Sequence, residues 1–272
     1  MTNIAFIGGG NMATALIGGL LQKGYARHEI SVVEVDSAAR DRLSRTLGVA
    51  VTEHPGTGVA NADVVLLAVK PQQLRGVALA LRPLLVSQLV LSIAAGIRTA
   101  DLAGWLGSYP LVIRAMPNTP ALVLAGVAAL YGMPSVTVAH RYTAESILGA
   151  VGSTIWVEPE ELMDAVTAVS GSGPAYVFYF IEALDQAARE LGLSAVQARQ
   201  LSLDTFLGAA RLAHGSSDEP ALLRARVTSK GGTTERALAC MDDARVKELV
   251  VEAIKQAAQR SRELGEELGA AR

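Results

Sequence analysis

Apolar runs alternate with helical patterns over roughly the first 160 residues of the chain. Short aliphatic runs are separated by segments in which apolar positions recur at the spacing of one helix face. This alternation is typical of a parallel sheet covered by helices on both faces. We expect strands at 3–7, 30–35, 63–68, 89–93, 111–116 and 125–131. The third run is apolar almost throughout, as in a strand that is buried on both faces.

The pattern changes after Glu158, where helical periodicity replaces the alternation. No convincing strand follows, and we expect long helices at 175–191, 194–214 and 243–264. The helix from 175 carries apolar residues almost all around its axis, so it should be buried on most sides. We therefore expect a homodimer in which this region interdigitates with its copy, although packing against the chain's own first domain is an alternative.

A glycine-rich motif joins the first expected strand to a helix. It has the form Gly-x-Gly-x-x-Ala, in which glycines allow a tight turn and a close approach to a pyrophosphate. The first amides of the helix and its dipole favour that anion. The chain is therefore predicted to be an α/β protein: a Rossmann-type, doubly wound, mostly parallel sheet in residues 1–160, then an all-α dimerisation domain in 161–272. The predicted cofactor-binding residues of the motif are Gly8, Gly9, Gly10, Asn11, Met12 and Ala13.

Two acids at the end of the second expected strand bear on the choice of cofactor. Glu34 and Asp36 lie roughly twenty residues beyond the glycine motif, the spacing at which an acid binds the adenosine ribose hydroxyls. Glu34 is favoured because it ends the strand, although alternation could instead direct Asp36 inward. A carboxylate repels a 2′-phosphate, whereas Arg40 and Arg42 lie close by in sequence and could still accept one. We expect NAD(P)H as cofactor, with NADH preferred and NADPH tolerated.

Loops at the carboxyl ends of other strands should face the same cofactor, because ligands of open parallel sheets bind there. Lys70 could donate to a ribose or phosphate oxygen, or could be a solvated lysine. Small residues after the fourth strand leave space for the nicotinamide ring. Asn118, between two prolines, offers hydrogen bonds near the cofactor or forms a purely structural turn. The predicted residues of these loops are Ala68, Val69, Lys70, Pro71, Ala94, Ala95, Gly96 and Asn118.

Composition narrows the class of protein. Half of the 272 residues are hydrophobic, the formal net charge is -2, and the 24 basic residues form no cluster suited to nucleic acid. The single cysteine, Cys240, excludes an internal disulfide framework and fits a reducing compartment. The four histidines are dispersed, which argues against a metal site. Without a basic leader or an apolar run of ~18 residues, we expect a cytoplasmic protein that is not bound to a membrane.

Four further segments together carry a specific resemblance. They are AVKP at 68–71, RAMPNTP at 114–120, SGSGPAY at 170–176 and VTSKGGTTERAL at 227–238. In this order, and nearly from end to end, the chain resembles the pyrroline-5-carboxylate reductase family, the last enzyme of proline biosynthesis. The resemblance implies hydride transfer from NAD(P)H to the C=N bond of 1-pyrroline-5-carboxylate, giving L-proline. It also implies a homodimer, which in relatives often assembles into a decamer of five dimers.

The loop 229–234 is the expected substrate site. A glycine-rich loop that enters a helix presents backbone amides to an anion, here the substrate carboxylate. By its position in the family's motif, Thr234 would hydrogen-bond the ring nitrogen and serve as the catalytic residue. A threonine hydroxyl is too weak an acid to donate its proton outright, so we expect it to orient the imine. A plain helix N-cap is the alternative. The predicted substrate-binding residues are Ser229, Gly231, Gly232, Thr233 and Thr234.

Two other functions compete with this one. A related NAD(P)-dependent imine or hydroxyacid dehydrogenase would share the architecture, but hydroxyacid dehydrogenases of this type normally need a lysine on the long helix. The chain has none between Ala175 and Gly192. A non-catalytic nucleotide-sensing relative would have lost the substrate loop, which is intact here.

Overall fold

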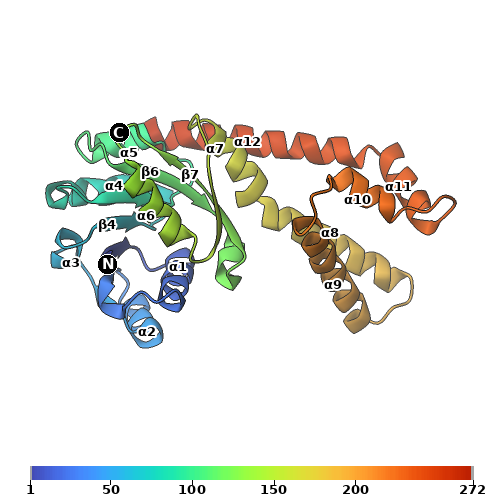
Figure 1. The fold of residues 1–272 in the computed structure, drawn as a ribbon, viewed down its shortest axis with the longest axis horizontal. Coiled ribbons are helices and arrows are strands. Elements are labelled where there is room, and N and C mark those ends of the chain that lie inside the picture. Colours follow the sequence, from blue (N-terminus) through green and yellow to red (C-terminus); the bar gives the residue numbers. More distant parts are fainter. Residues whose placement is uncertain (1, 271–272) are drawn as a thin grey trace. The chain divides into compact units, whose positions relative to one another are not determined.

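The computed structural model describes residues 2–270, and these form two compact units (Figure 1). The first unit runs to Ser172 and also includes residues 257–270. The second unit is Gly173–Gln256. The predicted domain boundary after residue 160 stays a prediction.

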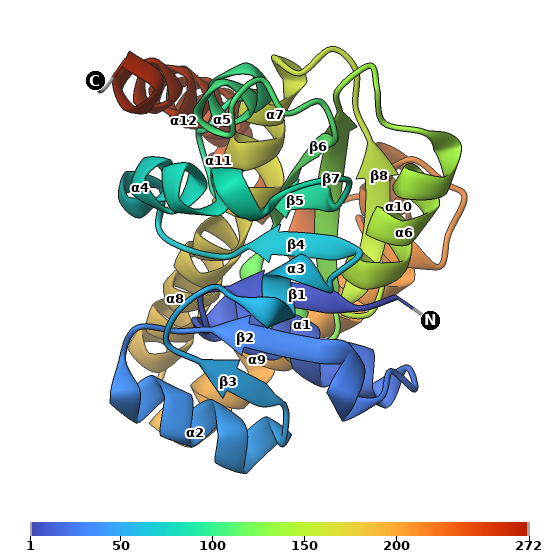
Figure 2. The same cartoon turned by 90° about the vertical axis from the view of Figure 1, so that its left-hand side faces the viewer.

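The first unit is built on a sheet that, within residues 2–270, has eight strands in the order β3-β2-β1-β4-β5-β6-β7-β8 (Figure 2). Neighbouring strands are parallel except for β6 and β7, which are antiparallel. The predicted mostly parallel sheet is therefore confirmed. The strands are β1 (Ile4–Ile7), β2 (Ile30–Val33), β3 (Ala50–Thr52), β4 (Val64–Leu67), β5 (Leu89–Ser92), β6 (Val112–Pro117), β7 (Gly126–Gly132) and β8 (Gly152–Trp156).

All six strands expected from the sequence are present, and two more were missed. The missed strands, β3 and β8, lie at the two edges of the sheet. Neither has a fully buried residue, because each presents one face to solvent. They therefore lack the continuous apolar run that marks the central strands.

Alternate side chains of the central strands pack into two separate hydrophobic cores, one on each face of the sheet. On one face, Phe6 and Leu66 pack with Leu16 and Ile147 from two helices. On the other face, Leu67 packs with residues of α4 and α5. The helices of this unit are α1 (Asn11–Gln22), α2 (Ser37–Leu47), α3 (Thr57–Ala60), α4 (Pro71–Leu81), α5 (Thr99–Trp105), α6 (Val138–Leu148) and α7 (Leu162–Val166). Short 3-10 turns lie at Arg27–Glu29, Arg82–Leu84 and Thr119–Val123, and a π-helical turn at Thr167–Gly171.

A largely buried polar network around Glu160 links several elements of the first unit. The carboxylate of Glu160 accepts hydrogen bonds from the Thr99 amide (2.8 Å), the Thr99 hydroxyl (2.7 Å) and the guanidinium of Arg114 (3.2 Å). A second buried bond joins Ser261 Oγ to Asp164 Oδ1 at 2.8 Å. Together they tie α5, β6, α7 and the last helix into one unit.

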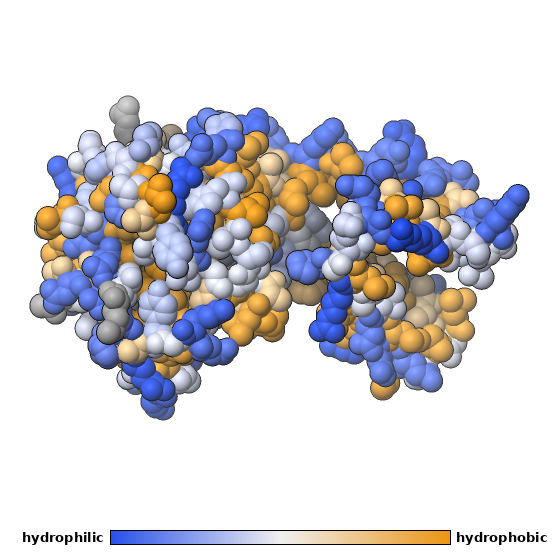
Figure 3. Space-filling view, in the orientation of Figure 1, coloured by the Kyte–Doolittle hydropathy of each residue, from blue (hydrophilic) through white to orange (hydrophobic). Residues whose placement is uncertain are grey.

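The second unit is helical and has little core of its own. Its helices are α8 (Gly173–Glu190), α9 (Ala195–His214), α10 (Pro220–Arg226), α11 (Thr233–Asp243) and the first part of α12 (Val246–Ala270). The long helices expected from the sequence are confirmed. In the single chain α8, α10 and α11 bury no residue, and apolar side chains lie on the surface of this unit (Figure 3). Among residues 2–270, no helix combines the length and apolarity needed to cross a bilayer.

Candidate active site

The glycine loop between β1 and α1 passes close against the end of β4. Gly8 has a φ of +99°, and its amide donates to the Val33 carbonyl at 2.8 Å. A Cβ at this position would lie 2.8 Å from the Ala68 carbonyl oxygen. Only glycine fits both the backbone conformation and the close approach.

The start of α1 is suited to an anion. Gly10 is the N-cap residue, and no side chain caps the helix. A Cβ on Gly10 would meet no atom within 4 Å, so the space above the helix N-terminus is open. The unpaired first amides and the helix dipole therefore favour a phosphate there, and this part of the chain fits the pyrophosphate of a dinucleotide.

A cavity of about 390 Å³ lies over the carboxyl ends of β1, β2, β3 and β4. This volume is within the ordinary range for small-molecule sites. The cavity brings together seven of the predicted cofactor-binding residues: Gly8, Gly9, Gly10, Glu34, Ala68, Val69 and Lys70. It also adds residues that the sequence analysis missed, among them Glu53, His54 and Gln73. Glu53 and His54 could have been found only from the short strand β3, whose end they follow.

The structure distinguishes the two candidate ribose acids. Glu34 lies on the cavity wall, and its carboxylate accepts from the amides of Gly9 (2.8 Å) and Asp36 (3.0 Å). Asp36 instead caps α2, because its carboxylate accepts from the amides of Ala38 (3.2 Å) and Ala39 (3.3 Å). Capping accounts for the acid at 36, whereas Glu34 lies on the wall of the cavity, and its role toward a ribose stays a prediction.

Other predicted residues lie outside the wall of this cavity. Gly96, with a φ of +80°, packs against the last helix, where a Cβ on Gly265 would lie 2.7 Å from the Gly96 carbonyl oxygen. The Asn118 amide group donates to the Ser170 carbonyl (3.1 Å), and its oxygen accepts from the Val127 amide (2.9 Å). These bonds favour the structural alternative for Asn118. The predicted residues that do not line the cavity are Asn11, Met12, Ala13, Pro71, Ala94, Ala95, Gly96 and Asn118.

The second glycine-rich loop, in the helical unit, has a different arrangement of donors. The Gly231 amide donates to the Glu235 carboxylate at 2.7 Å, and the Gly232 amide donates to the Ser229 carbonyl at 3.0 Å. Gly232 is the N-cap of α11, and no side chain caps this helix. The hydroxyls of the loop are thus not used as a plain N-cap. The amides of Thr233 and Thr234 lie in the first turn of α11, where backbone N–H groups have no carbonyl partner within the helix.

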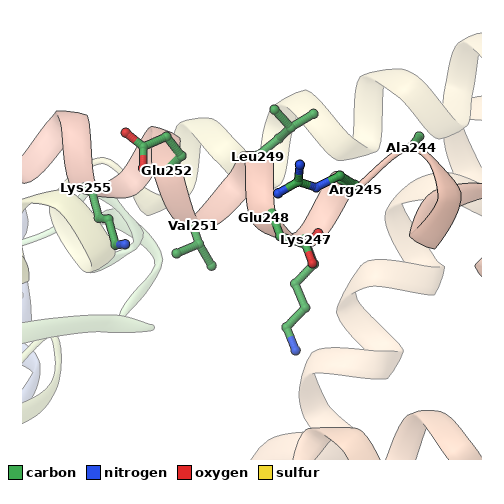
Figure 4. Close-up of a pocket in the computed structure, with 8 residues that line it drawn as sticks. All are labelled: Ala244, Arg245, Lys247, Glu248, Leu249, Val251, Glu252 and Lys255. Carbon is green, nitrogen blue, oxygen red and sulfur yellow. The ribbon is translucent and has the colours of Figure 1, made fainter.

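A larger hollow, of about 620 Å³, follows α12 and the turn before it. One continuous segment from Ala244 to Lys255 lines it, and Leu249 and Val251 project to different sides of that helix (Figure 4). Within the described part of the chain this segment alone forms the wall, so the hollow is exposed helix surface in the single chain. Among residues 2–270, no three His, Cys, Asp or Glu side chains gather as metal ligands would.

Comparison with known proteins agrees with this architecture. Residues 160–264 match the family model for pyrroline-5-carboxylate reductase dimerisation, and residues 3–96 match that for NADP oxidoreductase, coenzyme F420-dependent. The pyrroline-5-carboxylate reductase of Pseudomonas aeruginosa is 47% identical over 267 residues, which cover 98% of each chain. The chain belongs to the pyrroline-5-carboxylate reductase family. The resemblance inferred from the four sequence segments is therefore confirmed.

Solved structures of the same family have the same fold. A pyrroline-5-carboxylate reductase from Coxiella burnetii superposes with a TM-score of 0.92 at 42% identity, covering 97% of this chain and 98% of that one. A pyrroline carboxylate reductase from Plasmodium falciparum, solved with NADP bound, gives a TM-score of 0.87 at 27% identity over 97% of this chain and 98% of that one. Family membership thus agrees with the nucleotide site that the glycine loop and cavity indicate.

Proposed function

We propose that this protein is an NAD(P)H-dependent pyrroline-5-carboxylate reductase. The reaction adds hydride to the imine carbon and a proton to the nitrogen of 1-pyrroline-5-carboxylate, which gives L-proline. One observation carries the proposal: the chain is 47% identical to a reductase of this name across 98% of both chains. Both glycine-rich loops that the chemistry needs are intact.

The cavity in the sheet unit supplies the cofactor site. The reduced nicotinamide would provide the hydride when bound. The uncapped amides at the start of α1 would hold the pyrophosphate, and Glu34 would accept from the ribose hydroxyls. Because a carboxylate at this position repels a 2′-phosphate, we propose that NADH is preferred and NADPH tolerated. Lys70, exposed on the cavity wall at the N-cap of α4, would contact a ribose or phosphate oxygen.

The substrate site is proposed at the start of α11. The amides of Thr233 and Thr234 and the Ser229 hydroxyl would hold the carboxylate of the imine. The Gly231 and Gly232 amides shape the loop through their bonds to Glu235 and Ser229. The Thr234 hydroxyl would bond the ring nitrogen and orient it for reduction. Holding donor and acceptor at contact distance lowers a barrier by as much as ~7–11 kcal/mol in the best intramolecular models.

We also propose a homodimer formed through the helical unit, and a decamer of five dimers as the larger assembly. The match to a dimerisation model over 160–264 and the unburied apolar helices support the dimer. The decamer rests on the family resemblance alone. A cytoplasmic location is proposed from the single cysteine, Cys240.

Steady-state assays test the proposed reaction. The purified protein is given 1-pyrroline-5-carboxylate with NADH or NADPH, and both cofactor oxidation and proline formation are measured. We expect proline in amounts equal to the cofactor oxidised. Cofactor binding without oxidation would instead favour the nucleotide-sensing function, and oxidation with other imines or with hydroxyacids alone would favour a related dehydrogenase.

A further inference from the structure

Arg40, on α2, already donates three hydrogen bonds within the protein. Its Nη1 donates to the carbonyls of Glu34 (3.0 Å) and Val35 (2.8 Å), and its Nη2 donates to the Glu53 carboxylate at 3.2 Å. The Arg40 side chain is 22% exposed. The two backbone bonds fix the direction of the guanidinium, and Glu53 neutralises its charge.

Glu53 and Glu34 occupy equivalent places on neighbouring strands. Glu34 follows β2 and Glu53 follows β3; the Glu34 amide donates to the Thr52 carbonyl at 2.9 Å, which holds the two strand ends together. Both carboxylates line the nucleotide cavity, whereas Arg40, among the described residues, is not part of its wall. His54 Nε2 lies 4.0 Å from the other Glu53 oxygen. This end of the cavity therefore presents two acids, and the neighbouring Arg40 is paired with one of them.

A 2′-phosphate and a 2′-hydroxyl would meet this arrangement very differently. The hydroxyl donates to a carboxylate. The phosphate carries a charge of about −1.5 to −2 at neutral pH and favours a nearby cation. Glu53 keeps Arg40 from serving as that cation. Removing Glu34 alone would leave Arg40 paired with Glu53, so it would shift the cofactor preference only in part.

We propose that Glu53 is a second specificity residue for the nucleotide, which acts as a positioning residue by holding Arg40 away from a 2′-phosphate. This inference rests on the proposed function, because it concerns the same cavity. Glu53, which follows the edge strand β3, would thus share with Glu34 the discrimination between the two forms of the nucleotide.

Direct binding measurements separate this role from catalysis. Calorimetric titration of the full-length protein uses ADP-ribose and its 2′-phosphorylated form, which differ only in that phosphate and lack nicotinamide. In Glu53→Gln, which keeps the size of the side chain, we expect the affinity ratio to move about tenfold toward the phosphorylated probe. Asp41→Asn, which removes the same charge from an exposed acid beside Arg40 in sequence, is the matched control and should move the ratio less than twofold.

A double variant tests whether Glu53 acts through Arg40. Adding Arg40→Gln to Glu53→Gln should abolish the gain in affinity for the phosphorylated probe. The single variant Glu53→Asp, which keeps the charge, should retain most of the discrimination between the two probes. If loss of Arg40 unfolds the protein, salt provides the second measurement: the gain in Glu53→Gln should shrink as ionic strength rises, because the freed guanidinium binds the phosphate by charge. If Glu53 had a merely structural role, its loss would weaken the binding of both probes equally and leave the ratio of their affinities unchanged.

The outcomes distinguish this inference from the proposed function. Tight binding of ADP-ribose with an unchanged ratio in Glu53→Gln would overturn the role of Glu53 alone. That role is also overturned if Asp41→Asn shifts the affinity ratio as far as Glu53→Gln does. It is likewise overturned if the double variant Arg40→Gln, Glu53→Gln keeps the gain in affinity for the phosphorylated probe. Failure of the unaltered protein to bind either probe would remove the nucleotide site, and both proposals with it.

Discussion

Three consecutive glycines in the first loop have three different environments. A Cβ on Gly8 would approach the Ala68 carbonyl, and one on Gly9 would overlap the Leu43 side chain. Gly10 alone faces open space. At the residue scale, the first two glycines are therefore required by the fold, whereas the third is free for a ligand.

Gly10→Val should leave the protein folded and abolish binding of the dinucleotide. The branched side chain has room when no ligand is bound, but it would fill the space in which a pyrophosphate approaches α1. Thermal unfolding measures the fold, and titration with ADP-ribose measures binding. Gly18→Ala, at a helix position where a Cβ also meets no atom within 4 Å, is the matched control and should bind normally. Normal binding by Gly10→Val would remove this loop from the nucleotide site.

Thr234→Ala should lower turnover by about ten- to hundredfold, the effect expected for one lost hydrogen bond in the transition state. Affinity for the cofactor should stay near that of the unaltered protein, because Thr234 belongs to the helical unit and not to the nucleotide cavity. Thr234→Ser keeps the hydroxyl and should recover most of the rate. Equal turnover in Thr234→Ala would exclude the hydroxyl from the reaction.

At the scale of elements, Glu160 is the main polar link of the sheet unit. Its carboxylate holds both the start of α5 and Arg114 on β6, and the Arg114 side chain is only 6% exposed. Glu160→Ala would leave that guanidinium buried without its partner. We expect a loss of about 3–5 kcal/mol in the free energy of unfolding, measured by urea denaturation. Glu266→Ala, which breaks the exposed pair with Arg98, should cost less than about 1 kcal/mol. Similar losses for both would show that the buried network is not the stronger link.

Tyr109 should make the sheet unit sensitive to alkali. Burial raises the pKa of its hydroxyl above the ordinary value of 10.0, and the hydroxyl donates to the Gln88 carbonyl at 2.6 Å. Above pH 10 the unfolded chain releases this proton more readily than the folded chain, so the free energy of unfolding falls as the pH rises toward the raised pKa. Tyr109→Phe should have a lower free energy of unfolding at neutral pH, but that free energy should change less as the pH rises above 10. Denaturation curves at several pH values check both expectations.

The sequence was informative about strands that are buried on both faces and about loops with a specific motif. It could not show Glu53 at the nucleotide cavity, because β3 has three residues and no apolar run. It favoured Glu34 over Asp36 at the end of the strand, but it could not show that the Asp36 side chain caps α2. The contact of Gly96 with Gly265 on the last helix is likewise one that only the folded chain reveals, and the cofactor role of Gly96 stays a prediction.

At the scale of the whole molecule, the helical unit lacks a sufficient core in a single chain. Phe178 and Tyr179 on α8 are 65% and 69% exposed, and several leucines of α9 are also exposed. Apolar surface of this extent marks an interface with another chain. The match of residues 160–264 to the dimerisation model of the family agrees with this interpretation.

Stability should therefore depend on protein concentration. If the helical unit is completed by a second copy, mass action raises the unfolding temperature as concentration increases. Phe178→Asp should weaken association and remove most of that dependence, whereas Asp41→Asn on the sheet unit should leave it intact. Light scattering after size exclusion gives the mass of each species. An unfolding temperature that does not vary with concentration, together with the mass of one chain, would contradict the dimer.

The last helix has a consequence for how the polypeptide emerges during synthesis. Residues 257–270 belong to the same unit as the sheet, yet a ribosome makes them after the entire helical unit. Until then, the nascent chain holds Asp164 without Ser261, and the loop at Gly96 is not covered by Gly265. The sheet unit thus reaches its final form only once translation has passed Gly265, so premature termination within α12 would leave both units incomplete.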